Sequence, residues 1–382
     1  MPERSRIPLR ELFGFFLRLG MTGFGGPAAH IALMESEAVE RRRWLTRENL
    51  LDLIGACNLL PGPSSTQVAM ALGYTQGGWP GLLIAGACFI LPASLATLAL
   101  AWAYVRYGHL AQAQGLLYGA KPVMVAIIAQ AIWRLGRMAL RTWMLLLAGV
   151  ACLVATLLGA PPIAVLLIAG CVLSILAAQR TYRGRMHAIA VAPSGIIAAG
   201  APAALTAPGL LSLGLMFLKL GVVVFGSGYV LLAFLEADLV DRLHWVTKTQ
   251  LLDAITAGQI TPGPLFATAT FLGYLLHGCA GAAIATTAIF LPSFVMAGVV
   301  GALAGHLRRL PVLAGFLDGV NAAAVALMAG VTFTLARAAL FDAWTWSIAL
   351  ISAVLLLRYK INATWLILAG AGLGVLLRGF AW

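Results

Sequence analysis

The chain has 382 residues, of which 61% are hydrophobic and only 10% are charged. Because a soluble globular chain carries about 25% charged residues, these figures exclude a soluble enzyme, a disordered chain and a nucleic-acid-binding domain. They indicate an all-α polytopic membrane protein. At about 20 apolar residues per span plus short loops, the length accommodates about 10–13 spans.

The net charge is +12, and the distribution of the basic residues is typical of membrane anchoring. Basic residues gather in short clusters between apolar runs, such as Arg41–Arg43 and the group Arg180, Arg183 and Arg185. Such clusters are typical of cytoplasmic loops, so we expect a lipid bilayer and no nucleic acid as a partner. The five cysteines form no CxxC pair, and no metal or cofactor is expected.

Apolar segments follow one another along the chain in two similar series. The first series is 9–34, 51–73, 79–105, 113–133, 142–158 and 161–178. The second series is 210–235, 251–274, 279–305, 313–336, 344–357 and 363–377. The similar spacing suggests an internal repeat, which is the sequence signature of a duplicated fold.

The residues confirm that the two series are copies. Phe16–Gly20 (FLRLG) is matched 201 residues later by Phe217–Gly221 (FLKLG), and at the same offset Trp44 is matched by Trp245. After one deletion the offset becomes 200 and pairs Leu91-Pro92 with Leu291-Pro292. We therefore predict an N-terminal repeat over 1–178, a linker over 179–209 and a C-terminal repeat over 210–382.

The number of crossings decides whether the halves are inverted. If 9–34 crosses once and 51–73 does not cross, each half has five crossings, and inverted repeats result. If 9–34 is instead a second hairpin, Arg4, Arg6 and Arg10 join the basic side, and an extra crossing in 186–208 is needed. We expect inverted repeats, but the residues leave both counts open.

Two kinds of helix break recur in each half. The first kind consists of Gly23, Phe24, Gly25, Gly26 and Pro27, which is echoed by Phe225, Gly226, Ser227 and Gly228. The second kind is the PGP motif Pro61, Gly62 and Pro63, which is echoed by Pro262, Gly263 and Pro264. In duplicated transporters, substrates bind near the bilayer midplane, where such interrupted helices meet.

The PGP motif predicts a re-entrant hairpin. The ten residues of 51–60 span about 15 Å as a helix, which is half of a hydrocarbon core of about 30 Å. Two prolines around a glycine then end the helix. With Pro63 near its first position and Ser64 and Ser65 in its first turn, the next helix would direct free N–H groups and its positive dipole end inward. This is a candidate anion site, and the repeat predicts a second one at Pro264.

Three cations within apolar segments are candidate substrate ligands, because charge at membrane depth is costly. Arg18 and its repeat equivalent Lys219 precede the glycine breaks, and Lys121 lies where the second half has Asn321. These cations suit a divalent anion. The alternative is that Arg18 and Lys219 snorkel or form structural bridges with Asp52 and Asp253.

Uncharged polar residues near the breaks are further candidates for substrate binding. They either contact substrate or cap the broken backbone, and they are Asn58, Ser64, Ser65, Gln67, Gln259 and Thr261. Glu35 and its equivalent Glu236 end their helices and are either coupling carboxylates or solvated interfacial groups. His30, His277 and His306 are isolated, and no catalytic, dinucleotide or Walker A motif is present, so we expect neither an enzyme nor an ATP-driven pump.

The stretches FGFFLRLGMTGFGGPAAHIALM and NLLPGPSSTQVAMALGY, with their repeats FLKLGVVVFGSGYVLLAFLEADLV and GQITPGPLFATATFLGYLLHG, closely resemble the chromate ion transporter family. The resemblance covers nearly the whole chain and corresponds to the long, two-domain form. It implies a bacterial inner-membrane protein that exports chromate from the cytoplasm, confers chromate resistance and uses the proton-motive force. It also implies that sulfate, a similar tetrahedral dianion, interacts with the same site.

The second half departs from the first at both breaks. Gly26-Pro27 becomes Ser227-Gly228, and the polar run Ser64–Gln67 becomes Leu265–Thr268. We therefore predict that substrate contact is biased to the first half. Transport of sulfate or another oxyanion, an anion channel and an intramembrane reductase are the alternatives, of which the last lacks any redox motif or paired thiol. A homo-oligomer is left open.

Overall fold

The computed structural model describes residues 7–181, 209–225, 228–303, 311–359 and 361–379, and in these ranges the chain forms α-helices without a named strand. Most of the predicted linker, 182–208, lies outside the described residues. Five helical stretches are long and apolar enough to cross a membrane: Ser64–Tyr107, Ala111–Ala139, Pro162–Gln179, Leu265–Gly301 and Gly315–Ala339. The predicted all-α, multi-pass membrane fold is confirmed.

Each half contains a run of broken helices followed by long ones. The first half consists of α1 (Leu9–Thr22), α2 (Pro27–Met34), the π-helix η1 (Glu35–Arg41), α3 (Arg47–Cys57), α4 (Ser64–Tyr107), α5 (Ala111–Ala139), α6 (Trp143–Leu157) and α7 (Pro162–Thr181). The second half consists of α8 (Leu210–Val223), η2 (Gly228–Val230), α9 (Leu231–Leu235), the π-helix η3 (Glu236–Arg242), α10 (Lys248–Ile260), η4 (Leu265–Ala267), α11 (Thr268–Leu303), α12 (Pro311–Ala339), α13 (Ala343–Arg358) and α14 (Ala363–Gly379).

The longest helices, α4 and α11, are each two arms joined at a glycine. Gly78 has φ 65° and ψ −153°, and Gly278, its repeat equivalent, has φ 58° and ψ −148°. These angles are open to glycine and strained for other residues. The short first arm of α4 therefore turns back onto the long second arm, and α11 repeats the arrangement.

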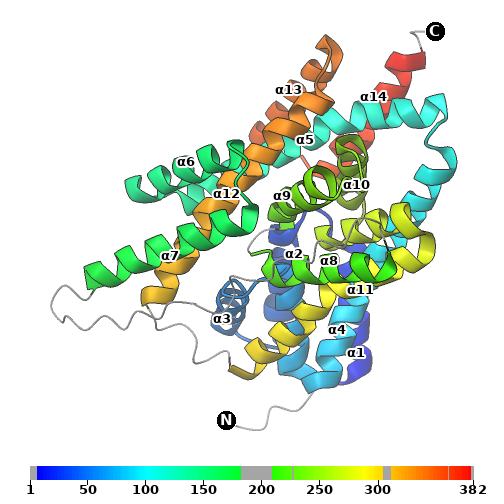
Figure 1. Cartoon of the computed structure of the whole chain (residues 1–382). Helices are drawn as coiled ribbons and strands as arrows, with labels where there is room; N and C mark the ends of the chain where they lie inside the picture. The colour runs from blue at the N-terminus through cyan, green and yellow to red at the C-terminus, as the bar shows by residue number, and fades with distance from the viewer. Residues whose placement is uncertain (1–6, 182–208, 226–227, 304–310, 360, 380–382) are drawn as a thin grey trace.

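The two halves are interleaved rather than set side by side. The helices α6 and α7 of the first half pack along α12, whereas α13 and α14 of the second half pack along α5 (Figure 1). The approach is close, because Gly119 on α5 faces the Gly370 carbonyl of α14, and the equivalent Gly319 on α12 faces the Ala169 carbonyl of α7. Small residues let helix backbones meet in this way inside a membrane.

A second bundle holds the breaks. The helices α4 and α11 pack against each other, α1 packs on α4, and α8 packs on α11. Large apolar side chains remain exposed on the outer helices, for example Trp143, Leu158, Trp344 and Trp365. A soluble protein rarely exposes so many, so these faces are suited to lipid.

Candidate functional site

The broken segments of the two halves cross and bond to each other. The Gly62 N–H donates to the Val224 carbonyl at 2.6 Å, and the Gly263 N–H donates to the Gly23 carbonyl at 2.8 Å. These two bonds are related by the repeat, and Pro61 also forms an isolated bridge with Phe225. Each PGP motif thus lies against the first-helix break of the other half. Gly226 and Ser227, which belong to that break, lie outside the described residues.

The first PGP motif opens directly into the polar first turn of α4. Pro63 is the N-cap of α4, so the helix itself begins at Ser64. Ser64, Ser65, Thr66 and Gln67 are all buried. The N–H groups of Thr66 and Gln67 both point to the Pro63 carbonyl. These bonds close the first turn, and the helix start presents the positive end of the helix dipole, which favours an anion.

Several polar atoms at this turn have no hydrogen-bond partner among the described residues. Gln67 donates through Nε2 to the Pro61 carbonyl at 2.5 Å, but its Oε1 is unpartnered, as is the Thr66 hydroxyl. Both side chains are 0% exposed. A buried polar group without a partner costs free energy, so such groups are concentrated where a ligand binds.

The second half contributes Ser293 to the same place. A Cβ atom built on Gly62 would lie 3.0 Å from the Ser293 hydroxyl and against the Gln67 amide, so all three residues meet at the PGP tip. Ser293 is fully buried, and its hydroxyl is unpartnered in the described part of the chain. Sequence reasoning missed this serine; its signal was its position directly after Pro292, whose repeat equivalent Pro92 is followed by Ala93.

His30 is the second residue that sequence reasoning missed, since we regarded it as isolated. Its Nε2 lies 2.9 Å from the Gly23 carbonyl, and its Nδ1 lies 3.2 Å from the Ser65 hydroxyl. A carbonyl only accepts, so Nε2 carries a proton, and in the neutral ring Nδ1 accepts from Ser65. His30 therefore ties the Gly23–Pro27 break to the polar turn of α4.

The second PGP motif has different surroundings. It is followed by the 3₁₀ turn η4, which is apolar, instead of starting an α-helix directly as predicted. Gly263 faces the methyl group of Ala93 where Gly62 faces Ser293. Thr261 is paired with Thr97 at 3.2 Å, and Gln259 lies within hydrogen-bonding reach of the buried Tyr229. The Thr268 hydroxyl is the unpartnered polar group in this turn.

The three predicted cations do not converge on the breaks. Arg18 is exposed on α1. Lys219 on α8 is paired with Asp238 at 2.8 Å, and Lys121 on α5 is paired with Asp253 at 2.9 Å. The alternative that Lys219 bridges to Asp253 is therefore wrong, because α10, which carries Asp253, packs against α5.

The remaining candidates are also dispersed. Asn58 is exposed at the C-cap of α3. Glu35 is half-buried and is paired with Arg47 at 2.8 Å, whereas Glu236 is buried and binds Lys248 and the Thr334 hydroxyl. The two equivalent carboxylates thus have different partners, and the Glu236 side chain is the better shielded one.

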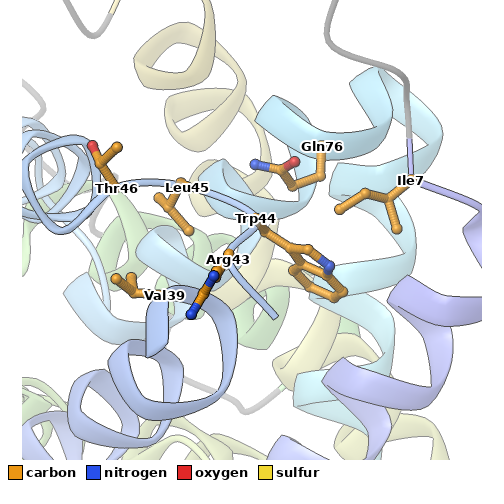
Figure 2. Close-up of a pocket in the computed structure, with 7 residues that line it drawn as sticks. All are labelled: Ile7, Val39, Arg43, Trp44, Leu45, Thr46 and Gln76. Carbon is orange, nitrogen blue, oxygen red and sulfur yellow. The ribbon is translucent and has the colours of Figure 1, made fainter. Parts of the chain in front are cut away.

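A surface cavity of about 560 Å³ lies apart from the breaks. Figure 2 shows Arg43, Trp44 and Gln76 around it, where the loop after η1 meets the end of the short arm of α4. None of the predicted site residues lines it. Within the described ranges, no group of three His, Cys, Asp or Glu side chains is placed to hold a metal ion.

Comparisons with known proteins agree with this two-part architecture. The sequence model described as "Chromate transporter" matches residues 10–175 and 211–375. A chromate transport protein of Cupriavidus metallidurans is 36% identical over 96% of this chain and 92% of its own length. A probable chromate transport protein of Synechococcus elongatus is 31% identical over 91% and 89%, and a chromate transport protein of Pseudomonas aeruginosa is 31% identical over 86% and 81%. No solved structure matches the chain. This multi-pass membrane protein, in which each PGP motif bonds to the helix break of the other half, belongs to the chromate transporter family.

Proposed function

We propose that this protein exports chromate from the bacterial cytoplasm across the inner membrane by alternating access, and that it thereby confers chromate resistance. The observation that carries the proposal is the crossing of the two breaks, with Gly62 bonded to Val224 and Gly263 bonded to Gly23. A site made of interrupted helices from both repeats is accessible from either side when one repeat moves against the other. Inverted repeats of about equal size would permit the site to open to one side of the membrane and then to the other.

The chemistry at the first PGP motif suits a tetrahedral dianion. The Ser293 hydroxyl and the Gln67 amide lie against the Gly62 backbone, and the unpartnered Thr66 hydroxyl belongs to the same helix start. Hydrogen bonds to a charged group contribute about 1.5–3 kcal/mol each, so a few such donors hold the anion without a fixed cation.

The direction of transport follows from the membrane potential. Moving one elementary charge through 100 mV changes the free energy by about 2.3 kcal/mol, so a dianion leaving a negative interior gains about twice that. Export needs little further energy until the outside concentration is high. Coupling export to the entry of protons would add to the free energy that the membrane potential supplies.

The experiment is chromate uptake into everted membrane vesicles, where export from the cytoplasm is measured as accumulation. Ser293→Ala and Thr66→Val should each reduce uptake about tenfold, because each removes an unpartnered hydroxyl that can donate a hydrogen bond to the anion. Ser352→Ala, which alters a buried serine on α13, is the matched control and should leave uptake unchanged. Wild-type rates in both site variants would refute the assignment of this turn.

The same vesicles separate the alternatives. A sulfate or other oxyanion transporter would take up labelled sulfate in preference to chromate, and an anion channel on the same scaffold would produce unitary currents in a planar bilayer. Chromate accumulation that saturates, that excess sulfate lowers only weakly and that occurs without unitary currents supports the exporter. A homo-oligomer is tested by the mass of the purified protein in detergent.

A further inference from the structure

A cavity of about 360 Å³ lies between the two halves, away from the crossed breaks. It is bounded by the end of α4, the start of α5, the start of α10 and the end of α12. This volume is large enough for several waters or for an oxyanion with part of its hydration shell. Its polar lining consists of Tyr104, Gln114, Tyr118, Lys121, Thr249 and Asp253.

One ion pair crosses this cavity from half to half. The Lys121 Nζ lies 2.9 Å from Asp253 Oδ1, and the Tyr104 hydroxyl donates to Oδ2 at 3.0 Å. The carboxylate side chain is only 2% exposed, whereas the lysine is 16% exposed. Asp253 is thus enclosed by groups of the first half, while its lysine partner retains contact with the cavity.

Stability alone does not account for this pair. Removing two charges from water costs several kcal/mol per ion, and a buried pair is often no more stable than apolar side chains of the same volume. Ionisable groups inside a membrane domain therefore indicate a functional site. A lysine beside a cavity of this volume can bind an anion, but here the Lys121 ammonium is already paired with the Asp253 carboxylate.

The pair is also present at only one of the two places that the repeat relates. The positions equivalent to Lys121, Asp253 and Tyr104 are Asn321, Asp52 and Ala304. The first-half equivalent of Asp253 is therefore kept, but neither the cation nor the hydroxyl is.

We propose that this cavity is a transit site for the transported oxyanion, in which Lys121 is bound alternately by Asp253 and by the substrate. This rests on the proposed function, in which the substrate is an oxyanion. An anion that enters the cavity displaces the carboxylate from the lysine, while the Tyr104 hydroxyl keeps Asp253 in place. Because the displaced carboxylate stays beside the lysine at high effective concentration, it rebinds and expels the anion. Transport requires such weak, multi-site binding, since a tightly held ion does not leave.

Asp253 is therefore a specificity- and rate-determining residue that acts through Lys121. Its removal should strengthen anion binding and slow release, which changes KM and kcat in the same direction. Removal of the lysine should weaken binding. A merely structural pair would change the amount of folded protein instead, and would change neither constant for the molecules that fold.

The test is the kinetics of chromate uptake by the purified full-length protein in proteoliposomes, with rates expressed per folded transporter. In Asp253→Asn we expect KM and kcat each to fall about tenfold, and in Lys121→Gln we expect KM to rise about tenfold. The double variant, Lys121→Gln with Asp253→Asn, removes both charges together. It therefore tests the proposal even if a single variant does not fold. It should retain the raised KM of Lys121→Gln.

The control is Asp318→Asn, which breaks the exposed Arg141–Asp318 pair between the same two halves outside the cavity. It should leave both constants unchanged. An unchanged or raised KM in Asp253→Asn, or wild-type kinetics in the double variant, would overturn the proposal while leaving chromate export intact. The proposed function itself fails separately, if the wild-type protein takes up no chromate.

Discussion

The two PGP motifs have the same backbone and different chemistry. Both tips donate one N–H to the opposite break, at 2.6 Å from Gly62 and at 2.8 Å from Gly263. Around the first tip, Ser293, Thr66 and Gln67 carry unpartnered polar atoms, whereas the second tip meets Ala93 and an apolar 3₁₀ turn that is followed by the unpartnered Thr268 hydroxyl. Duplication has therefore kept a symmetric scaffold, and we infer that substrate binding has been concentrated on one side of it.

This comparison predicts symmetric effects for scaffold variants. Gly119→Leu and Gly319→Leu should each prevent stable folding, because the new side chain would meet a backbone carbonyl of α14 or α7 that cannot move aside. Overpacking of this kind costs about 3 kcal/mol. Thermal unfolding in detergent measures it, with Gly372→Leu as control, since nothing lies within 4 Å of a Cβ built there. A large difference between the two variants would show that the scaffold is not symmetric.

It predicts asymmetric effects for the turns after the PGP motifs. Replacing Ser64–Gln67 by the residues of 265–268 should lower chromate uptake about a hundredfold, because two or more hydrogen bonds to the anion are lost. The reverse exchange, which places the polar residues after Pro264, should leave uptake within about twofold. Uptake in everted vesicles, at matched protein levels, measures both. Equal losses would mean that both turns bind substrate.

His30 sharpens the comparison further, since its second-half equivalent is Leu231. His30→Leu removes the hydrogen bonds to Gly23 and Ser65 and should reduce uptake about tenfold through misplacement of the turn. His30→Gln, which retains a donor and an acceptor, should recover part of the rate. Leu231→Met, at the same position in the other half, should have no effect beyond about twofold. Full activity of His30→Leu would remove this residue from the site.

The smallest effects are expected for the two cations of the first helices. Arg18→Gln should raise KM about threefold, because an exposed charge attracts the anion only through solvent, and added salt should abolish the difference. Lys219→Gln should change KM by about twofold or less, since Lys219 is already paired with Asp238, which keeps Arg242 as a second partner. A tenfold or larger effect of either variant would place that cation at the substrate instead.

Much of the fold was predictable because it depends on local chemistry. Apolar runs of helical length, the two PGP motifs and the repeat offset all lie in the sequence, and the observed helices start and end close to the expected segments. The Gly-rich runs mark places where the helix cannot continue, whatever surrounds them. The first turn of α4, with Ser64 and Ser65, was also expected in nearly its observed place.

The partners of the polar residues were not predictable. Lys219 meets Asp238 instead of Asp253, His30 meets Ser65, and Ser293 reaches the PGP tip of the other half. Each of these contacts either joins segments far apart in the chain or involves a residue that had several possible partners in the sequence. Local patterns do not rank such alternatives, because the decisive energy comes from packing.

By itself, the sequence determined that this protein is a duplicated, all-helical membrane protein whose helices break at four glycine- and proline-rich points. Those properties follow from the hydrophobic effect and from backbone sterics, which act on neighbouring residues. Only the tertiary structure decided that the halves interleave, that each PGP motif closes the break of the other half, and that Asp253 holds Lys121 across a cavity. Those properties depend on contacts between residues far apart in the chain, such as Gly62 with Val224 and Lys121 with Asp253, which local patterns do not specify.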